Sequence, residues 1–169
     1  EYVTVQLNDT HPVISIPELI RLLLKEGVEF NEALEIAKKT FNYTNHTIMQ
    51  EALEKWDLKI IKKVNLEVAE IIVRINKVFK AELRKLKVDT EKLPELLIIQ
   101  NKRVHMAYLA CFCSTYINGV AKIHSDILKQ NVLKNWFQIY PQKFQNKTNG
   151  ITPRRWLAVA NPPLSEFIT

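Results

Sequence analysis

The sequence predicts a mostly α-helical segment with few strands of its own. Only 3 of its 169 residues are glycine, whereas an average share of about 7% would give roughly 12. This scarcity disfavours turn-rich sandwiches and barrels and glycine-rich phosphate loops. Apolar residues make up 47% of the chain, which excludes a disordered protein. The length is sufficient for roughly one domain with a real core.

Hydrophobic periodicity predicts the elements in order. Val3, Val5 and Leu7 alternate with polar residues, which is typical of a half-buried strand. Apolar residues at helical spacing follow, with a left-handed cap at Gly27 and the longest stripe over 66–86. The predicted helices cover 15–26, 31–41, 51–56, 58–64, 66–86, 104–114, 120–130 and 154–160. Because one strand cannot form a sheet, we expect the first strand to lack partners in this chain, unless further strands lie within 96–117.

The positive charge is confined to one part of the chain. The formal net charge is +6, and residues 55–103 carry all of it, with 13 Lys and Arg against 7 Asp and Glu. The basic side chains of the longest predicted helix are Lys77, Lys80, Arg84 and Lys85. A solvated helical face explains this pattern better than a nucleic-acid interface. A basic helical nucleic-acid-binding domain is therefore the alternative, and we expect no nucleic acid as partner.

The two cysteines and the chain's hydropathy bear on its compartment. Cys111 and Cys113 lie in an apolar run, so we expect buried free thiols and no metal site, because His105 alone does not complete a zinc centre. Apolar runs fall short of the ~18 residues that span a membrane. The first residues lack the pattern of a signal peptide. We expect a cytoplasmic protein that does not act at a membrane.

The polar, non-helical stretches share a composition of Asn, Asp, Thr and His. They are 8–11, 42–47 and 146–150. Four Asn residues precede a Thr by two, where chance predicts about one such pair. Loops at element ends are where binding groups usually lie, and neutral donors and acceptors suit a ligand dense in hydroxyl groups, such as a sugar. Turn and helix capping is the competing explanation for the same residues.

Four sequence blocks resemble the glycogen/α-glucan phosphorylase family, which includes the starch and maltodextrin enzymes. They occur in the family's order and at its spacing, and they run through nearly the whole chain. The blocks are LNDTHP at 7–12, YTNHT with EALEKW at 43–47 and 51–56, NGVAKIHS at 118–125 and KFQNKTNGITPRRW at 143–156. The chain resembles an internal fragment of such an enzyme, well under half of it.

This resemblance implies a two-domain α/β glycosyltransferase (GT-B-like) architecture. Residues 1–151 would be the C-terminal part of the N-terminal domain, and 152–169 the crossover and the start of the C-terminal domain. The family transfers a glucosyl unit from α-1,4-glucan to inorganic phosphate, giving glucose 1-phosphate. It uses pyridoxal 5'-phosphate on a lysine that would lie downstream of this chain. The parent would be an allosteric, homodimeric enzyme, and the isolated segment would be inactive.

The resemblance also assigns roles to residues. His46 would be catalytic, with its carbonyl and ring against the glucosyl unit at the cleavage site. Asn149 would bind the same sugar from the crossover loop. Asp9 and His11 would line the saccharide path, and Glu54 would lie behind the sugar pocket.

The chain departs from the family pattern at five positions. Gln50 replaces a usual proline, and His105 and Tyr108 stand where the family has Asn and His. Cys113 and Thr115 stand where the family has Gly and His. We expect the Thr115 change to remove an imidazole close to the site. A non-catalytic helical carbohydrate-binding module is the second alternative.

Overall fold

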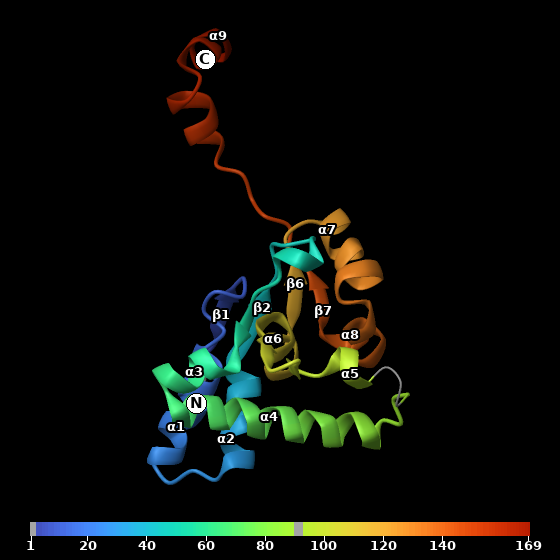
Figure 1. Cartoon of the computed structure of the whole chain (residues 1–169). Coiled ribbons are helices and arrows are strands. Elements are labelled where there is room, and N and C mark those ends of the chain that lie inside the picture. Colours follow the sequence, from blue (N-terminus) through green and yellow to red (C-terminus); the bar gives the residue numbers. More distant parts are fainter. Residues whose placement is uncertain (1–2, 90–92) are drawn as a thin grey trace.

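The computed structural model describes residues 3–89 and 93–169 (Figure 1). Four short strands form a parallel sheet in the order β1-β2-β6-β7. Their bounds are Val5–Asn8 (β1), Phe41–Thr44 (β2), Ile117–Gly119 (β6) and Phe144–Asn146 (β7). The predicted first strand is therefore confirmed, but the prediction that it lacks partners is wrong. Strands of three or four residues inside polar stretches carry too few alternating positions to be recognised.

A second, antiparallel sheet has the order β3-β5-β4. Its strands are Lys55–Asp57 (β3), Ile99–Gln100 (β4) and Arg103–His105 (β5). The helix predicted over 51–56 is thus a 3₁₀ turn, Gln50–Ala52 (η1), followed by β3. The prediction for 104–114 is too long by one strand, since β5 occupies its start.

Helices make up most of the remaining described chain. They are α1 Ser15–Lys25, α2 Phe30–Thr40, α3 Leu58–Val64, α4 Leu66–Lys85, α5 Leu93–Leu96, α6 Met106–Cys113, α7 Lys122–Ile127, α8 Lys134–Ile139 and α9 Pro162–Ile168. A π-helical turn, Leu128–Val132 (η2), extends α7, and a 3₁₀ turn, Pro141–Lys143 (η3), precedes β7. The mostly helical character is confirmed, as are α1, α3 and the full length of α4. Gly27 closes α1 with φ of +84°, a conformation that favours glycine.

The core lies between the parallel sheet, α6 and α4. Figure 1 shows α6 in front of the sheet and α4 running beneath it. Every residue of α6 except Tyr108 is buried, including Cys111 and Cys113, which are free as predicted. Burial raises the pKa of the Cys113 thiol to about 12, so it is protonated at neutral pH and unreactive. Phe79 of α4 stacks on Trp136 with ring centroids 4.8 Å apart.

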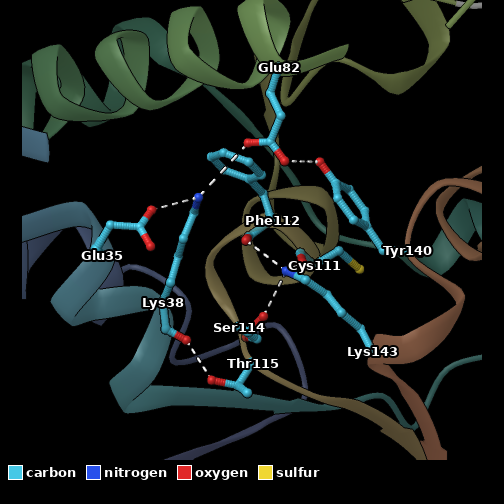
Figure 2. Close-up of polar contacts among 9 residues, drawn as sticks. All are labelled: Glu35, Lys38, Glu82, Cys111, Phe112, Ser114, Thr115, Tyr140 and Lys143. Atoms are coloured by element: carbon cyan, nitrogen blue, oxygen red, sulfur yellow. Dashed lines mark hydrogen bonds and ion pairs between the residues drawn. The ribbon is translucent and has the colours of Figure 1, made fainter. Parts of the chain in front are cut away.

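A polar network anchors the edge of the sheet where the strands begin (Figure 2). The Lys143 ammonium donates to the carbonyl oxygens of Cys111, Phe112 and Ser114 at 3.0, 3.0 and 2.8 Å. These carbonyls end α6, so a cation from η3 satisfies the acceptors that a helix C-terminus leaves open. Tyr140 donates to Glu82 of α4 at 2.7 Å. The network ties α4, α6 and the entry to β7 together.

The last part of the chain lies apart from this body. From Asn146 onward every described residue is exposed except Leu157 and Ser165, which are half-buried. Figure 1 shows this segment leading away from the sheet to a π-helical turn, Arg155–Val159 (η4), and α9. Trp156 is 63% exposed. Over the described residues, none of the helices has both the length and the apolar character needed to cross a bilayer.

Candidate functional site

The candidate site is built on the edge where the four parallel strands end. β1 ends at Asn8, β2 at Thr44, β6 at Gly119 and β7 at Asn146. Because the strands are parallel, the loops that follow them meet at one edge. We call the segments 8–11, 44–47, 118–121 and 146–149 the carboxyl edge. They include four of the five predicted site residues, Asp9, His11, His46 and Asn149, and leave out Glu54.

Asn8 and Asp9 hold the loop that carries His46. The His46 Nε2–H donates to Asn8 Oδ1 at 2.6 Å, and the exposed ring lies at the end of β2. Asp9 has a φ of +65°, and its amide still donates to the Thr44 carbonyl at 2.9 Å. The Asp9 carboxylate accepts the Thr10 amide at 2.7 Å and the Thr47 hydroxyl at 3.5 Å. An Asp in a left-handed conformation is uncommon and typical of functional loops.

A row of neutral polar groups crosses the three strands. The Thr44 hydroxyl donates to Asn118 Oδ1 at 2.9 Å and accepts from Gln6 Nε2 at 2.7 Å. Asn45 is fully buried, and its Nδ2 donates to the Tyr43 hydroxyl at 2.9 Å. These bonds fix the pleat of β1, β2 and β6 beside the exposed His46.

Main-chain bonds to the turn after β6 position the Asn149 loop. The Asn149 amide donates to the Val120 carbonyl at 2.9 Å, and the Lys147 amide donates to the Gly119 carbonyl at 3.1 Å. The Asn149 side chain is exposed. The backbone of Asn149 therefore fixes it at the carboxyl edge, while its side-chain carboxamide stays accessible to a ligand.

Asn146 closes the other side of this loop. Its Oδ1 accepts the Ser125 hydroxyl at 2.9 Å, and its Nδ2 donates to the Thr148 hydroxyl at 3.1 Å. Asp126, the next residue of α7, pairs instead with Lys122 at 3.0 Å. His124, Ser125 and Asp126 are residue types found in catalytic triads, but as neighbours on α7 they point away from one another and do not form one.

His11 and Glu54 form a separate pair at the flank of the site. Their Nδ1 and Oε1 atoms lie 3.2 Å apart. The fold thus pairs Glu54 with His11. His11 also lines a cavity of about 490 Å³ whose walls are mostly apolar. The other residues around it are Ile14, Glu18, Trp56, Ile60, Ile61, Val64, Asn65, Val68 and Met106.

A buried histidine lies beneath the carboxyl edge. His124 is 8% exposed, and its Nδ1 accepts the Val120 amide at 3.0 Å. Burial lowers the pKa of His124, the proximity of His46 acts in the same direction, and the Asp9 carboxylate opposes them. The ring is therefore neutral at neutral pH and lies within electrostatic range of both loop residues.

Thr115 does not lie where the sequence predicts it. It precedes β6, at the edge where the strands begin, and its hydroxyl donates to the Lys38 carbonyl at 2.7 Å. Figure 2 shows Thr115 beside Lys38 in the polar network. Strand β6 separates position 115 from the carboxyl edge, and the effect of this substitution on a sugar site stays a prediction.

The arrangement suits recognition of a polyhydroxylated ligand. Amides, hydroxyls and the exposed imidazoles of His11 and His46 lie in the segments of the carboxyl edge, and all can donate or accept hydrogen bonds. The carboxyl edge includes Lys147, whose side chain is exposed, while the amino group of Lys143 is engaged with three carbonyls at the opposite edge. Neither lysine combines an unpaired amino group with an enclosing pocket, so these two residues do not fit the attachment of pyridoxal phosphate.

Several residues of the site carry no individual signal in the sequence. Sequence reasoning groups Asn8 and Asn146 only as members of repeated Asn-x-Thr triplets. It leaves Asn118 and His124 without a role. Their contribution depends on the register of the strands and on the turn after β6. Strands of three residues are too short for their register to be predicted from the sequence.

Comparisons with known proteins agree with these features. A family model described as carbohydrate phosphorylase matches residues 1–169. The chain is 48% identical over 171 residues to the brain form of glycogen phosphorylase from Rattus norvegicus, covering 98% of this chain and 20% of that protein. It is 48% identical over 173 residues to alpha-glucan phosphorylase 2, cytosolic, from Arabidopsis thaliana, covering 99% and 21%. The chain spans about a fifth of the length of these relatives.

Proposed function

Because the chain belongs to the carbohydrate phosphorylase family, we propose that it supplies the sugar-binding side of an α-1,4-glucan phosphorylase site. The observation that carries this proposal is the carboxyl edge, where Asp9, His46 and Asn149 converge on loops that follow parallel strands. Ligands of open α/β sheets bind at this edge. The edge carries mainly neutral hydrogen-bonding groups, with one carboxylate at Asp9 and one lysine at Lys147, and this character fits a glucosyl unit better than a phosphate.

In the proposed reaction, inorganic phosphate attacks C1 of the terminal glucosyl unit. The bond from C1 to the glycosidic oxygen breaks, and a bond from C1 to a phosphate oxygen forms. The proton that the attacking hydrogen phosphate carries passes to the 4-oxygen of the departing glucan. His46 lies against the glucosyl unit and Asn149 binds it from the crossover loop. Asp9 and His11 line the path of the remaining glucan, with Glu54 orienting His11 through their 3.2 Å contact.

The rest of the parent protein completes the site. Pyridoxal 5'-phosphate would supply an acid/base phosphate group and would be held there, together with the cationic side chains that bind inorganic phosphate. We propose that residues 1–151 belong to the N-terminal domain and 152–169 begin the second domain of a GT-B-like, homodimeric, cytoplasmic enzyme. Residues 152–169 are mostly exposed, and Trp156 is open to solvent (Figure 1). This exposure supports the proposal that another part of the parent protein packs against them.

The test measures glucose 1-phosphate release by the full-length protein with soluble glucan and inorganic phosphate. We expect Asn149→Ala to lower kcat/KM by about tenfold, the effect of roughly one lost hydrogen bond in the transition state. The matched control is Asn131→Ala, because Asn131 is exposed on η2 outside the carboxyl edge. The isolated 169 residues should release none. Equal effects of the two substitutions, or release by the isolated chain, would contradict the proposal.

A further inference from the structure

We infer that His124 is a positioning residue of this site, acting through Nδ1 on the turn that holds Asn149. The inference rests on the proposed function in one respect, because it takes Asn149 as a sugar-binding residue. It assigns a role to α7, whose residues lie outside the four segments of the carboxyl edge.

Val120 is the link between the two residues. Its amide donates to His124 Nδ1 at 3.0 Å, and its carbonyl accepts the Asn149 amide at 2.9 Å. The peptide group before Val120 is therefore held by the His124 ring, and the peptide group after Val120 holds the Asn149 loop. Displacing the Val120 amide would move the carbonyl that holds Asn149.

The turn fits tightly around the imidazole. A Cβ at Gly119 would lie 2.9 Å from His124 Nδ1 and 2.5 Å from the Ser125 hydroxyl. Ser125 in turn donates to Asn146, the residue at which β7 ends. The first turn of α7 thus contacts the β6 end, the following turn and the Asn149 loop at once, as the adjacency of β6, β7 and α7 in Figure 1 indicates.

The hydrogen-bonding state of the ring separates its two nitrogens. Because Nδ1 accepts a hydrogen bond from an amide, the neutral ring carries its proton on Nε2. Nε2 is buried and has no partner among the described residues. An unpaired buried donor is destabilising, so the presence of histidine at this position is explained by the Nδ1 acceptor and not by a satisfied core histidine.

Two substitutions of similar size distinguish the nitrogens in the full-length protein. In His124→Asn the amide oxygen can replace Nδ1 as acceptor for Val120, whereas in His124→Gln the amide lies near the Nε2 position. We expect His124→Asn to keep kcat/KM for glucan phosphorolysis within about threefold of the unsubstituted protein, and His124→Gln to lower it by about tenfold or more.

A second readout does not depend on activity. Hydrogen exchange of the segment 146–150 without ligand reports the bond from the Asn149 amide to Val120. We expect His124→Gln to exchange faster in this segment and His124→Asn to resemble the unsubstituted protein. If the unsubstituted protein does not cleave glucan, the proposed function fails while this exchange comparison still tests the role of His124.

The outcomes are distinct. Equal loss in both variants would mean that the ring only fills space, and retention in His124→Gln with loss in His124→Asn would assign the role to Nε2. Either result overturns the inference. If His124→Gln does not fold, His124→Asn alone decides, since loss of its activity and its protection of 146–150 contradicts the Nδ1 role.

Discussion

Gly119 shows how much of the carboxyl edge depends on single residues. It ends β6. Its φ is not in the left-handed range that often requires a glycine, unlike the φ of Gly27. The reason is close approach. The Ser125 hydroxyl, His124 Nδ1 and the Ser125 Cα all lie within 2.9 Å of where a Cβ would stand.

Gly119→Ala should therefore destabilise the chain. We expect the free energy of unfolding in urea to fall by about 1–3 kcal/mol, the usual cost of overpacking, because one of the clashing atoms belongs to the backbone of α7. Gly150→Ala is the control, since a Cβ there meets nothing within 4 Å, and it should change stability by less than about 0.5 kcal/mol. Similar effects at both positions would contradict the close approach.

His105 should make stability depend on pH. Burial, helped by the positive charge of Lys55, lowers its pKa from 6.5 to about 4. Between these values the unfolded chain binds a proton that the folded chain does not, so stability falls as pH falls. His105→Asn should remove this part of the decline, measured as the difference between unfolding free energies at pH 7 and pH 5. An unchanged pH dependence in the variant would show that His105 titrates normally.

Single residues also mark the limit of what the sequence predicts. The repeated polar triplets indicate hydroxyl recognition, and the family resemblance selects His46, Asp9 and Asn149 from among the capping residues. Neither signal pairs Glu54 with His11, and neither places Thr115 at the opposite edge. Both facts depend on strand register, which is decided by contacts between residues far apart in sequence.

At the level of elements, long helices are predictable and short strands are not. α4 is read from its apolar stripe because twenty residues provide several turns of periodicity. β6 and β7 have three residues each, and their polar sequences suit loops as well as strands. The elements packed around these strands stabilise their pairing instead. Lys143, directly before β7, contributes by bonding the carbonyls at the end of α6.

Lys143→Met tests that contribution. The substitution keeps much of the side chain's length but leaves three carbonyl oxygens at the end of α6 without their charged donor. We expect a loss of about 2–4 kcal/mol in the free energy of unfolding. Lys147→Met, at an exposed position of the following loop, should change it by less than about 0.5 kcal/mol. Equal stability of the two variants would mean that the ammonium does not cap α6.

At the scale of the whole molecule, the proposed function makes the chain one side of a site. It covers about a fifth of the length of its relatives, and its proposed sugar-binding groups and Lys143 lie on opposite edges of one sheet. The mostly helical composition and the scarcity of glycine fit this partition, since the described residues include no glycine-rich phosphate loop. Because only the carboxyl edge is proposed to bind sugar, the opposite edge of the same sheet serves as its control.

Hydrogen exchange of the full-length protein, with and without soluble glucan and inorganic phosphate, tests whether the carboxyl edge binds sugar. We expect glucan to slow exchange in the carboxyl edge, at 8–11, 44–47, 118–121 and 146–149. Exchange at the opposite edge, at 38–41, 114–116 and 141–143, should stay unchanged. Protection confined to the opposite edge, or no change at either edge under conditions where glucan is bound, would contradict it.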